Sequence, residues 1–234
     1  MPYPASPVIP EAQTSVPLAA LLFDLDGTLA ETDSLHLLAW ARVLRPHGIE
    51  IDEDSYKENI SGRLNPDVVN DLLPKLSPAE ARQLIETKEE DFLQRAGDLV
   101  PLPGLLDMID DSREKGLRLA LVTNAPTDNA TAVLKALGLD RVFDPVVLAS
   151  DVGTGKPDPA LYKSALKRLE MTPGAALAFE DSPSGVASAV GAGIATVGIA
   201  STQEPAELRR AGAGLVVEDF ADPRLQALMV RRQA

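Results

Sequence analysis

Cysteine is absent from this chain of 234 residues, and basic side chains are scarce in it. The first absence excludes disulfide bonds and thiolate metal sites. Lysine and arginine number 22 against 35 aspartate and glutamate residues, so the formal net charge is −13. Nucleic acid and anionic membranes bind basic faces, and this balance therefore argues against both as partners. It is compatible with a phosphorylated small molecule, because a few local cations or a metal ion reverse the field inside a cleft.

Targeting and membrane-spanning segments are not evident either. Residues 1–7 lack both basic residues and an apolar centre, so we predict no secretory signal and a flexible proline-rich tail over residues 1–17. Residues 182–203 are uncharged and long enough to raise the question of a membrane span, but Pro183 and four glycines interrupt them. We predict a short helix and a strand there. We expect a soluble, cytoplasmic protein without a membrane partner, and a monomer.

The most informative stretch of the sequence is FDLDGTL, residues 23–29, which follows the apolar run of residues 18–22. Alternate residues of a strand point to the same side, so Asp24 and Asp26 can face one site. Two carboxylates this close repel each other unless a cation or a shared proton relieves them, which is typical of a functional site. Gly27 allows a sharp turn. The alternative is an ordinary strand followed by an acidic turn, since Asp-Gly turns are common.

Strands and helices are predicted to alternate from residue 101 onward. The expected helices cover residues 105–115, 128–137, 159–169, 185–190 and 205–211, and the expected strands cover 117–122, 146–148, 175–179, 194–197 and 215–217. This alternation predicts a parallel sheet with helices on both faces. Ligands of such sheets bind at the carboxyl ends of the strands, where the acidic turn, Thr123 and Glu180-Asp181 fall.

Residues 34–99 carry helical signals and almost no strand signals. The first helix is expected to end at Pro46 and Gly48. Its apolar face consists of Leu35, Leu38, Trp40, Val43 and Leu44. Asn65-Pro66 is expected to open another helix, with the asparagine side chain as its cap, and a capping box at residues 77–80 to start a third. We therefore predict an all-helical domain over residues 34–99, inserted into a core of residues 18–33 and 100–234.

DLDGT at residues 24–28 resembles the first motif of the haloacid dehalogenase-like superfamily of phosphotransferases. TN at residues 123–124, KP at 156–157 and EDS at 180–182 resemble its further motifs in the same order, and the likeness spans residues 18 to about 217. The resemblance implies an α/β fold with a Rossmann-like core. The helical insertion resembles the cap of the branch that includes β-phosphoglucomutase and sugar-phosphate phosphatases.

The resemblance implies catalytic roles for two aspartates and a magnesium ion. Asp24 would be the nucleophile that forms an aspartyl-phosphate, and Asp26 the general acid and base. The Mg²⁺ would be held by the side chain of Asp24, the main-chain carbonyl of Asp26 and the side chain of Asp181, with Glu180 as a further ligand. The alternative for Glu180 and Asp181 is that they only cap the following helix.

Phosphate contacts are implied for the next two motifs. The hydroxyl of Thr123 and the main-chain N–H of Asn124 would donate to a phosphate oxygen, and Lys156 would contact both Asp24 and the phosphoryl group. The alternatives are an ordinary helix start and a solvated lysine. In the cap, the resemblance assigns substrate binding to Thr32, His36, Arg63 and Lys88. The alternatives are a structural histidine for His36 and solvated surface cations for Arg63 and Lys88. Of the two cations, Arg63 is the better anchor for a second phosphate, because a guanidinium matches phosphate with two parallel hydrogen bonds.

We expect a magnesium-dependent phosphatase that hydrolyses small phosphorylated metabolites, sugar phosphates or bisphosphates. Asp26 favours phosphoryl transfer, because family members that cleave carbon–halogen bonds lack an aspartate at that position. One alternative is an isomerase of the β-phosphoglucomutase type, which returns the phosphoryl group to the sugar. Another is a non-catalytic phosphate-binding module, although pure binding does not require a nucleophile.

Overall fold

The computed structural model describes residues 16–233, so the predicted tail of residues 1–17 lies almost entirely outside the described residues. The described strands form one sheet in the order β3-β2-β1-β4-β5-β6, and every neighbouring pair is parallel. They are β1 (Ala20–Phe23), β2 (Arg118–Thr123), β3 (Val146–Leu148), β4 (Ala176–Glu180), β5 (Ala195–Ile199) and β6 (Leu215–Val217). The predicted α/β core with a parallel sheet is confirmed.

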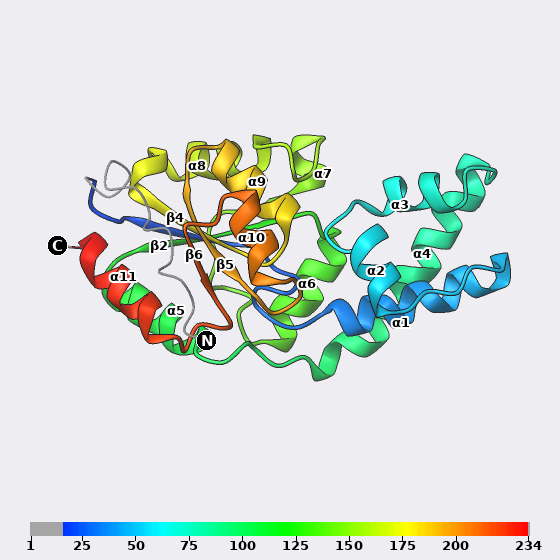
Figure 1. The fold of residues 1–234 in the computed structure, drawn as a ribbon, viewed down its shortest axis with the longest axis horizontal. Coiled ribbons are helices and arrows are strands. Elements are labelled where there is room, and N and C mark those ends of the chain that lie inside the picture. Colours follow the sequence, from blue (N-terminus) through cyan, green and yellow to red (C-terminus); the bar gives the residue numbers. More distant parts are fainter. Residues whose placement is uncertain (1–15, 234) are drawn as a thin grey trace.

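Helices cover both faces of this sheet (Figure 1). They are α5 (Leu105–Glu114), α6 (Thr127–Ala136), α7 (Ala149–Val152), α8 (Ala160–Leu169), α9 (Pro183–Gly191), α10 (Pro205–Ala211) and α11 (Pro223–Gln233). Alternate strand residues point to opposite faces. Leu21 and Phe23 therefore pack in one apolar cluster with α5, α6 and α11, whereas Ala20 and Leu22 pack in a second cluster with α8 and α9. The sequence analysis predicted neither α11 nor α7, which is a single turn.

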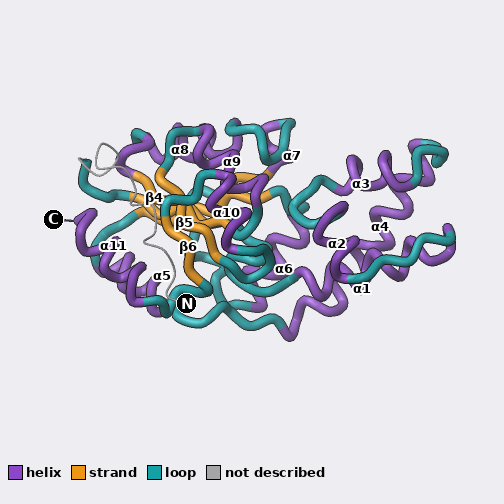
Figure 2. Tube along the Cα trace, viewed as in Figure 1, coloured by secondary structure: helices purple, strands orange, loops and turns teal. Residues whose placement is uncertain are grey.

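Residues 33–98 form helices and loops (Figure 2). The α-helices are α1 (Asp33–Leu44), α2 (Glu53–Asn59), α3 (Asn65–Leu72) and α4 (Pro78–Arg95). These helices lie together to one side of the sheet (Figure 1) and share an apolar cluster of their own around Trp40, separate from the clusters of the sheet. We call these residues the cap. The sequence analysis predicted an inserted domain over residues 34–99, and these domain boundaries remain a prediction.

Local signals in the cap were partly misread. The capping box is confirmed, because Ser77 accepts from the Glu80 N–H at 3.3 Å and Glu80 accepts from the Ser77 N–H at 2.8 Å. Leu38, which was predicted on the apolar face of the first helix, is 51% exposed and so does not pack in the interior. The cap assigned to Asn65 was wrong: Asn65 is already the first helical residue of α3, and its amide donates to Glu89 instead.

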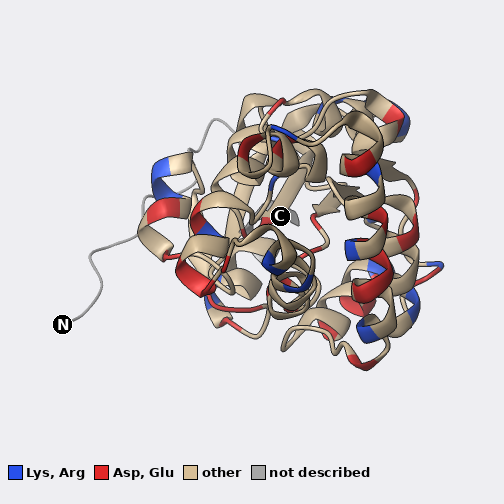
Figure 3. Ribbon diagram, turned by 90° about the vertical axis from the view of Figure 1, so that its right-hand side faces the viewer, with Lys and Arg blue, Asp and Glu red and all other residues tan. Residues whose placement is uncertain are grey.

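Charged residues of both signs are spread over the helices. In the view of Figure 3, basic positions alternate with acidic ones and form no continuous basic face. Within residues 16–233, no helix combines the length and the apolar character that a bilayer crossing requires. The segment that raised this question forms α9 and β5, as the prediction of a short helix and a strand required.

Candidate active site

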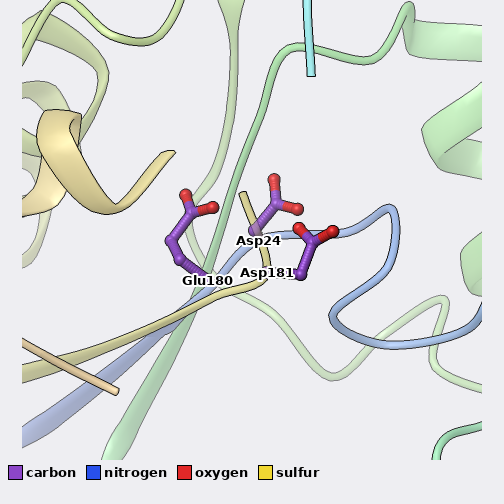
Figure 4. A group of neighbouring side chains, drawn as sticks. All are labelled: Asp24, Glu180 and Asp181. Carbon is purple, nitrogen blue, oxygen red and sulfur yellow. The ribbon is translucent and has the colours of Figure 1, made fainter. Parts of the chain in front are cut away.

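Three neighbouring strands deliver acidic and polar residues to one edge of the sheet. β1 lies between β2 and β4, so Asp24 after β1 is flanked by Thr123 at the end of β2 and Glu180 at the end of β4. Asp181 follows directly. Carboxylate oxygens of Asp24, Glu180 and Asp181 lie within 4.8 Å of one another, and the three side chains point beyond the strand ends (Figure 4). Because α9 is capped by the Ser182 hydroxyl, Glu180 and Asp181 are free of the capping role.

Lys156 is the cation of this group. Its ammonium forms an ion pair with Asp24 and lies 2.6 Å from the Oε1 atom of Glu180, which also accepts from the Tyr162 hydroxyl at 2.5 Å. The lysine is buried, so the alternative of a solvated side chain is excluded. Although burial alone would lower the pKa of Lys156, the two carboxylates raise it above its usual value.

The three carboxylates together exceed what Lys156 neutralises. Burial raises the pKa of Asp24, of Asp181 and of Glu180, the last to about 8, because removing charged oxygens from water is costly. Within the described part of the chain, the buried Oε2 atom of Glu180 has no hydrogen-bond partner. Buried, all-oxygen donor sets with excess negative charge suit a hard divalent cation such as Mg²⁺. The residues present therefore fit the ion that the resemblance implies.

Gly27 and Thr202 fix the position of Asp181, and the sequence analysis had singled out only Gly27. Gly27 has φ +72°, and a Cβ atom there would lie 2.1 Å from the Oδ2 atom of Asp181, so glycine is required by both conformation and space. Thr202, in the loop after β5, donates to the same oxygen at 2.5 Å. The sequence analysis missed Thr202. Its place after a parallel strand was the only available signal.

Asp26 contacts the first helix of the cap. Its Oδ1 atom accepts from the Thr32 hydroxyl at 2.8 Å and lies 3.4 Å from Nε2 of His36. The Lys88 ammonium lies 2.9 Å from Nδ1 of His36, which leaves Nε2 as the atom that donates to Asp26. Burial alone would raise the pKa of Asp26, but His36 and Thr32 lower it below its usual value. The imidazole also stacks on Phe92, with ring centroids 4.1 Å apart.

Lys88 and Glu89 form an ion pair on α4, in which Lys88 is buried and Glu89 partly buried. Lys88 is 2% exposed, donates to Glu89 at 3.0 Å and lies over the rings of Trp40 and Phe92. Burial lowers the pKa of Lys88 below its usual value, even though Glu89 acts in the opposite direction. The alternative of a solvated lysine is excluded here as well. Glu89 itself was not predicted as a site residue.

Thr123, the last residue of β2, and Asn124, which follows it, act through different atoms. The Thr123 hydroxyl, almost fully buried, accepts from the Ala125 N–H at 2.9 Å and is free to donate. The Asn124 side chain accepts from the Lys156 N–H at 2.9 Å and donates to the Gly62 carbonyl of the cap at 3.3 Å. The prediction used only the main-chain N–H of Asn124, but its side chain also ties the lysine loop to the cap.

Arg63 also lines the site, but its guanidinium is already engaged. It forms an ion pair with Asp71 and donates to the Asn59 carbonyl at 2.9 Å. Most predicted site residues share one cavity: Asp24, Asp26, His36, Arg63, Lys88, Thr123, Asn124, Lys156 and Asp181. Thr32 and Glu180 lie behind this lining. The cavity has a volume of about 90 Å³, below the roughly 300–1,000 Å³ of typical ligand pockets. Asn124 and Asn129 of the core donate to Gly62 and Glu89 of the cap, so the cap lies close over the strand ends.

A buried carboxylate paired with a lysine, beside further carboxylates at the ends of parallel strands, is the arrangement expected of a phosphoryl-transfer site. The sequence model of the haloacid dehalogenase-like hydrolases matches residues 21–199, which is well over half of the chain. The protein belongs to the haloacid dehalogenase-like hydrolase family and is an enzyme of that family. The resemblance identified from the four motifs is confirmed.

Curated relatives and solved structures agree with this assignment. The chain is 32% identical over 204 residues to validoxylamine A 7'-phosphate phosphatase of Streptomyces hygroscopicus subsp. limoneus, covering 87% of this chain and 94% of that protein. It is 27% identical over 220 residues to β-phosphoglucomutase of Bacillus subtilis (strain 168), covering 90% and 94%. A crystal structure of a CbbY variant from Rhodobacter sphaeroides, in complex with xylulose-(1,5)bisphosphate, superposes with TM-score 0.78 at 28% identity, covering 88% and 96%.

Proposed function

We propose that the protein is a magnesium-dependent phosphatase that hydrolyses small phosphorylated sugars through an aspartyl-phosphate. The single observation that supports this most is the buried Asp24 carboxylate, ion-paired with Lys156 and beside two further carboxylates at the strand ends. A carboxylate kept only for binding a phosphate would repel it. A nucleophilic carboxylate loses its own negative charge when it bonds to phosphorus, and this role explains why Asp24 is buried there.

In the first step, a carboxylate oxygen of Asp24 attacks phosphorus, and the bond from phosphorus to the alcohol oxygen breaks. Lys156 balances charge on the phosphoryl oxygens, and the Thr123 hydroxyl and Asn124 N–H donate to them. The leaving alkoxide takes a proton from Asp26. In the substrate-free site, hydrogen bonds from His36 and Thr32 lower the pKa of Asp26. Binding of the negative phosphoryl group raises that pKa, so Asp26 takes up a proton from water before it protonates the alkoxide.

In the second step, water replaces the departed alcohol. Asp26, now ionised, removes a proton from the water, whose oxygen attacks phosphorus. The bond between phosphorus and the Asp24 oxygen breaks, which releases inorganic phosphate and restores the carboxylate. Thr32 and His36 hold Asp26 toward the site in both steps, and Lys88 orients His36 through its other ring nitrogen.

The metal would be held by the side chains of Asp24 and Asp181 and the main-chain carbonyl of Asp26, with Glu180 as a further ligand. When bound, Mg²⁺ supplies charge neutralisation for an anionic nucleophile that meets an anionic substrate. Glu180 is fixed by Lys156 and Tyr162, and Asp181 by Thr202. These contacts orient the donor oxygens before any ion arrives.

Relatives support a sugar or sugar-like alcohol as the leaving group. One is named for a phosphorylated validoxylamine, another for phosphoglucose, and a third was crystallised with a xylulose bisphosphate. The test is phosphate release from a panel of sugar phosphates, with and without Mg²⁺. We expect turnover that is lost with EDTA and restored by Mg²⁺. Metal-independent turnover, or none on the whole panel, would contradict the proposal.

A phosphoglucomutase-type isomerase is the second candidate. The closed cap and the similarity to the Bacillus subtilis mutase favour it, because excluding water lets the phosphoryl group return to a sugar. Product analysis separates the two functions. An isomerase converts a sugar 1-phosphate to the 6-phosphate with little free phosphate, whereas a phosphatase releases phosphate in proportion to the substrate consumed.

A further inference from the structure

The cavity wall opposite Asp24 has few charges available to a ligand. Besides Lys156, the lysines and arginines that line the cavity within residues 16–233 are Arg63 and Lys88. Both already have a carboxylate partner: Lys88 pairs with Glu89 inside the protein, and Arg63 pairs with Asp71 near the surface. A second phosphate on a substrate would therefore meet cations whose charge is already offset by a carboxylate.

Glu89 is the least displaceable of these carboxylates. Its Oε1 atom accepts from Lys88 at 3.0 Å and from the Asn65 amide, and its Oε2 atom accepts from the Asn129 amide at 2.5 Å. The three donors come from two cap helices, α3 and α4, and from α6 of the core. The closed cap therefore holds a carboxylate in the wall of the cavity.

A second carboxylate, Asp33, also lines this wall. It accepts from the Tyr56 hydroxyl at 3.0 Å and from the Ser61 hydroxyl at 3.2 Å. Two carboxylates, those of Asp33 and Glu89, thus line the wall beside Lys88 and Arg63, and Arg63 is paired with Asp71 outside the lining. Carboxylate oxygens with free lone pairs accept from hydroxyls, and the Trp40 ring in the same cavity offers an apolar surface to carbon-bound hydrogens.

Resting on the proposed phosphatase function, we propose that the substrate is a phosphate monoester of an uncharged, hydroxyl-rich alcohol, such as a sugar or a cyclitol, and that Glu89 selects against bisphosphates. Glu89 accepts hydroxyl protons of such an alcohol and repels a second phosphate at the same place. Specificity of this kind comes from an unfavourable contact with the wrong substrate as well as a favourable one with the right substrate.

The test compares kcat/KM for sugar monophosphates and for the matching bisphosphates, using the full-length protein with Mg²⁺. We expect the monophosphates to be preferred by about tenfold or more, since like charges brought together at a closed site are strongly unfavourable. Glu89→Gln keeps the shape and removes the charge. The Asn129 Oδ1 atom, buried without a partner among the described residues, can accept from the new amide if the Asn129 amide rotates.

Glu89→Gln should move the ratio toward the bisphosphate by about tenfold. Glu90→Gln removes the same charge from an exposed position of α4 and should leave the ratio unchanged. Asp71→Asn, at a side chain that is 63% exposed, frees Arg63 and should shift the ratio in the same direction as Glu89→Gln without a folding defect.

Three results would overturn the inference. They are a wild-type preference for bisphosphates, an unchanged ratio in a folded Glu89→Gln protein, and a selective loss of bisphosphate turnover in Arg63→Ala, which would make Arg63 the anchor of a second phosphate. If no sugar phosphate of either kind is hydrolysed, the proposed function fails, and this inference fails with it for that separate reason.

Discussion

The strand ends and the cap wall that faces them handle charge in opposite ways. At the strand ends, three buried carboxylates share one lysine, so negative charge is left over and burial raises their pKa values. In the cap wall, each cation has its own carboxylate. The first region carries excess negative charge that a bound cation would offset, whereas both cations of the second region are paired before any ligand binds. The proposed function and the inferred selectivity thus assign chemistry to the strand ends and substrate choice to the cap wall of one cavity.

The largest effect is expected at the strand ends. Asp24→Asn should reduce kcat by about 10⁴-fold or more, because an amide does not attack phosphorus and is a poor ligand for Mg²⁺. The measurement is single-turnover phosphate release, with circular dichroism to verify the fold. Substantial turnover in a verified Asp24→Asn preparation would rule out the covalent step. The strand ends would then no longer differ from the cap wall as the place of the reaction.

Asp26 joins the two regions, since it follows β1 but is held by cap residues. Asp26→Ala should lower kcat by about 10²- to 10⁴-fold on sugar phosphates, because the same group serves as acid and then as base. An activated aryl phosphate should lose less, as its leaving group needs no proton. Wild-type turnover of that aryl phosphate would mean that another group activates water.

Lys88→Met tests whether the Lys88–Glu89 ion pair stabilises the cap wall. Removing the ammonium leaves the largely buried Glu89 without its cation and His36 without a donor, so we expect a loss of about 2 kcal/mol in the free energy of unfolding. The double variant Lys88→Met/Glu89→Gln should recover much of that loss. Urea unfolding measures both. Additive losses would show that the two side chains act independently.

The smallest effect is expected away from the cavity, at Asp91 on α4. Hydrogen bonds from Arg95, together with Arg42, lower the pKa of Asp91 below its usual value near 3.8. A lowered pKa stabilises the fold above the usual value, and the contribution is lost as pH falls through the folded-state pKa. Asp91→Asn should cost about 1 kcal/mol at pH 7, and in urea unfolding the difference from wild type should shrink as the pH falls below 3.8 and vanish only below the folded-state pKa. An unchanged difference at pH 3 would contradict this.

Much of the core site was predictable because strand periodicity and parallel topology carry it. The acidic turn after β1, Thr123 and Glu180-Asp181 each follow an apolar run, and such runs pair side by side with their carboxyl ends together. Local signals in the cap were less reliable. Asn65-Pro66 marked the start of a helix correctly, but nothing local indicated that the asparagine amide would turn to Glu89.

The sequence by itself determined the fold class, the family and the strand-end residues, since these depend on periodicity and on motifs of a few adjacent positions. Only the tertiary structure decided which charges are paired. Lys88 and Arg63 read alike in the sequence as cap cations, yet Lys88 is buried against His36 and Glu89, whereas Arg63 pairs with Asp71 near the surface. Likewise, Thr202 and Asn129 join the site across long stretches of chain. Such partners depend on how separate helices and loops pack in space, which no local pattern encodes.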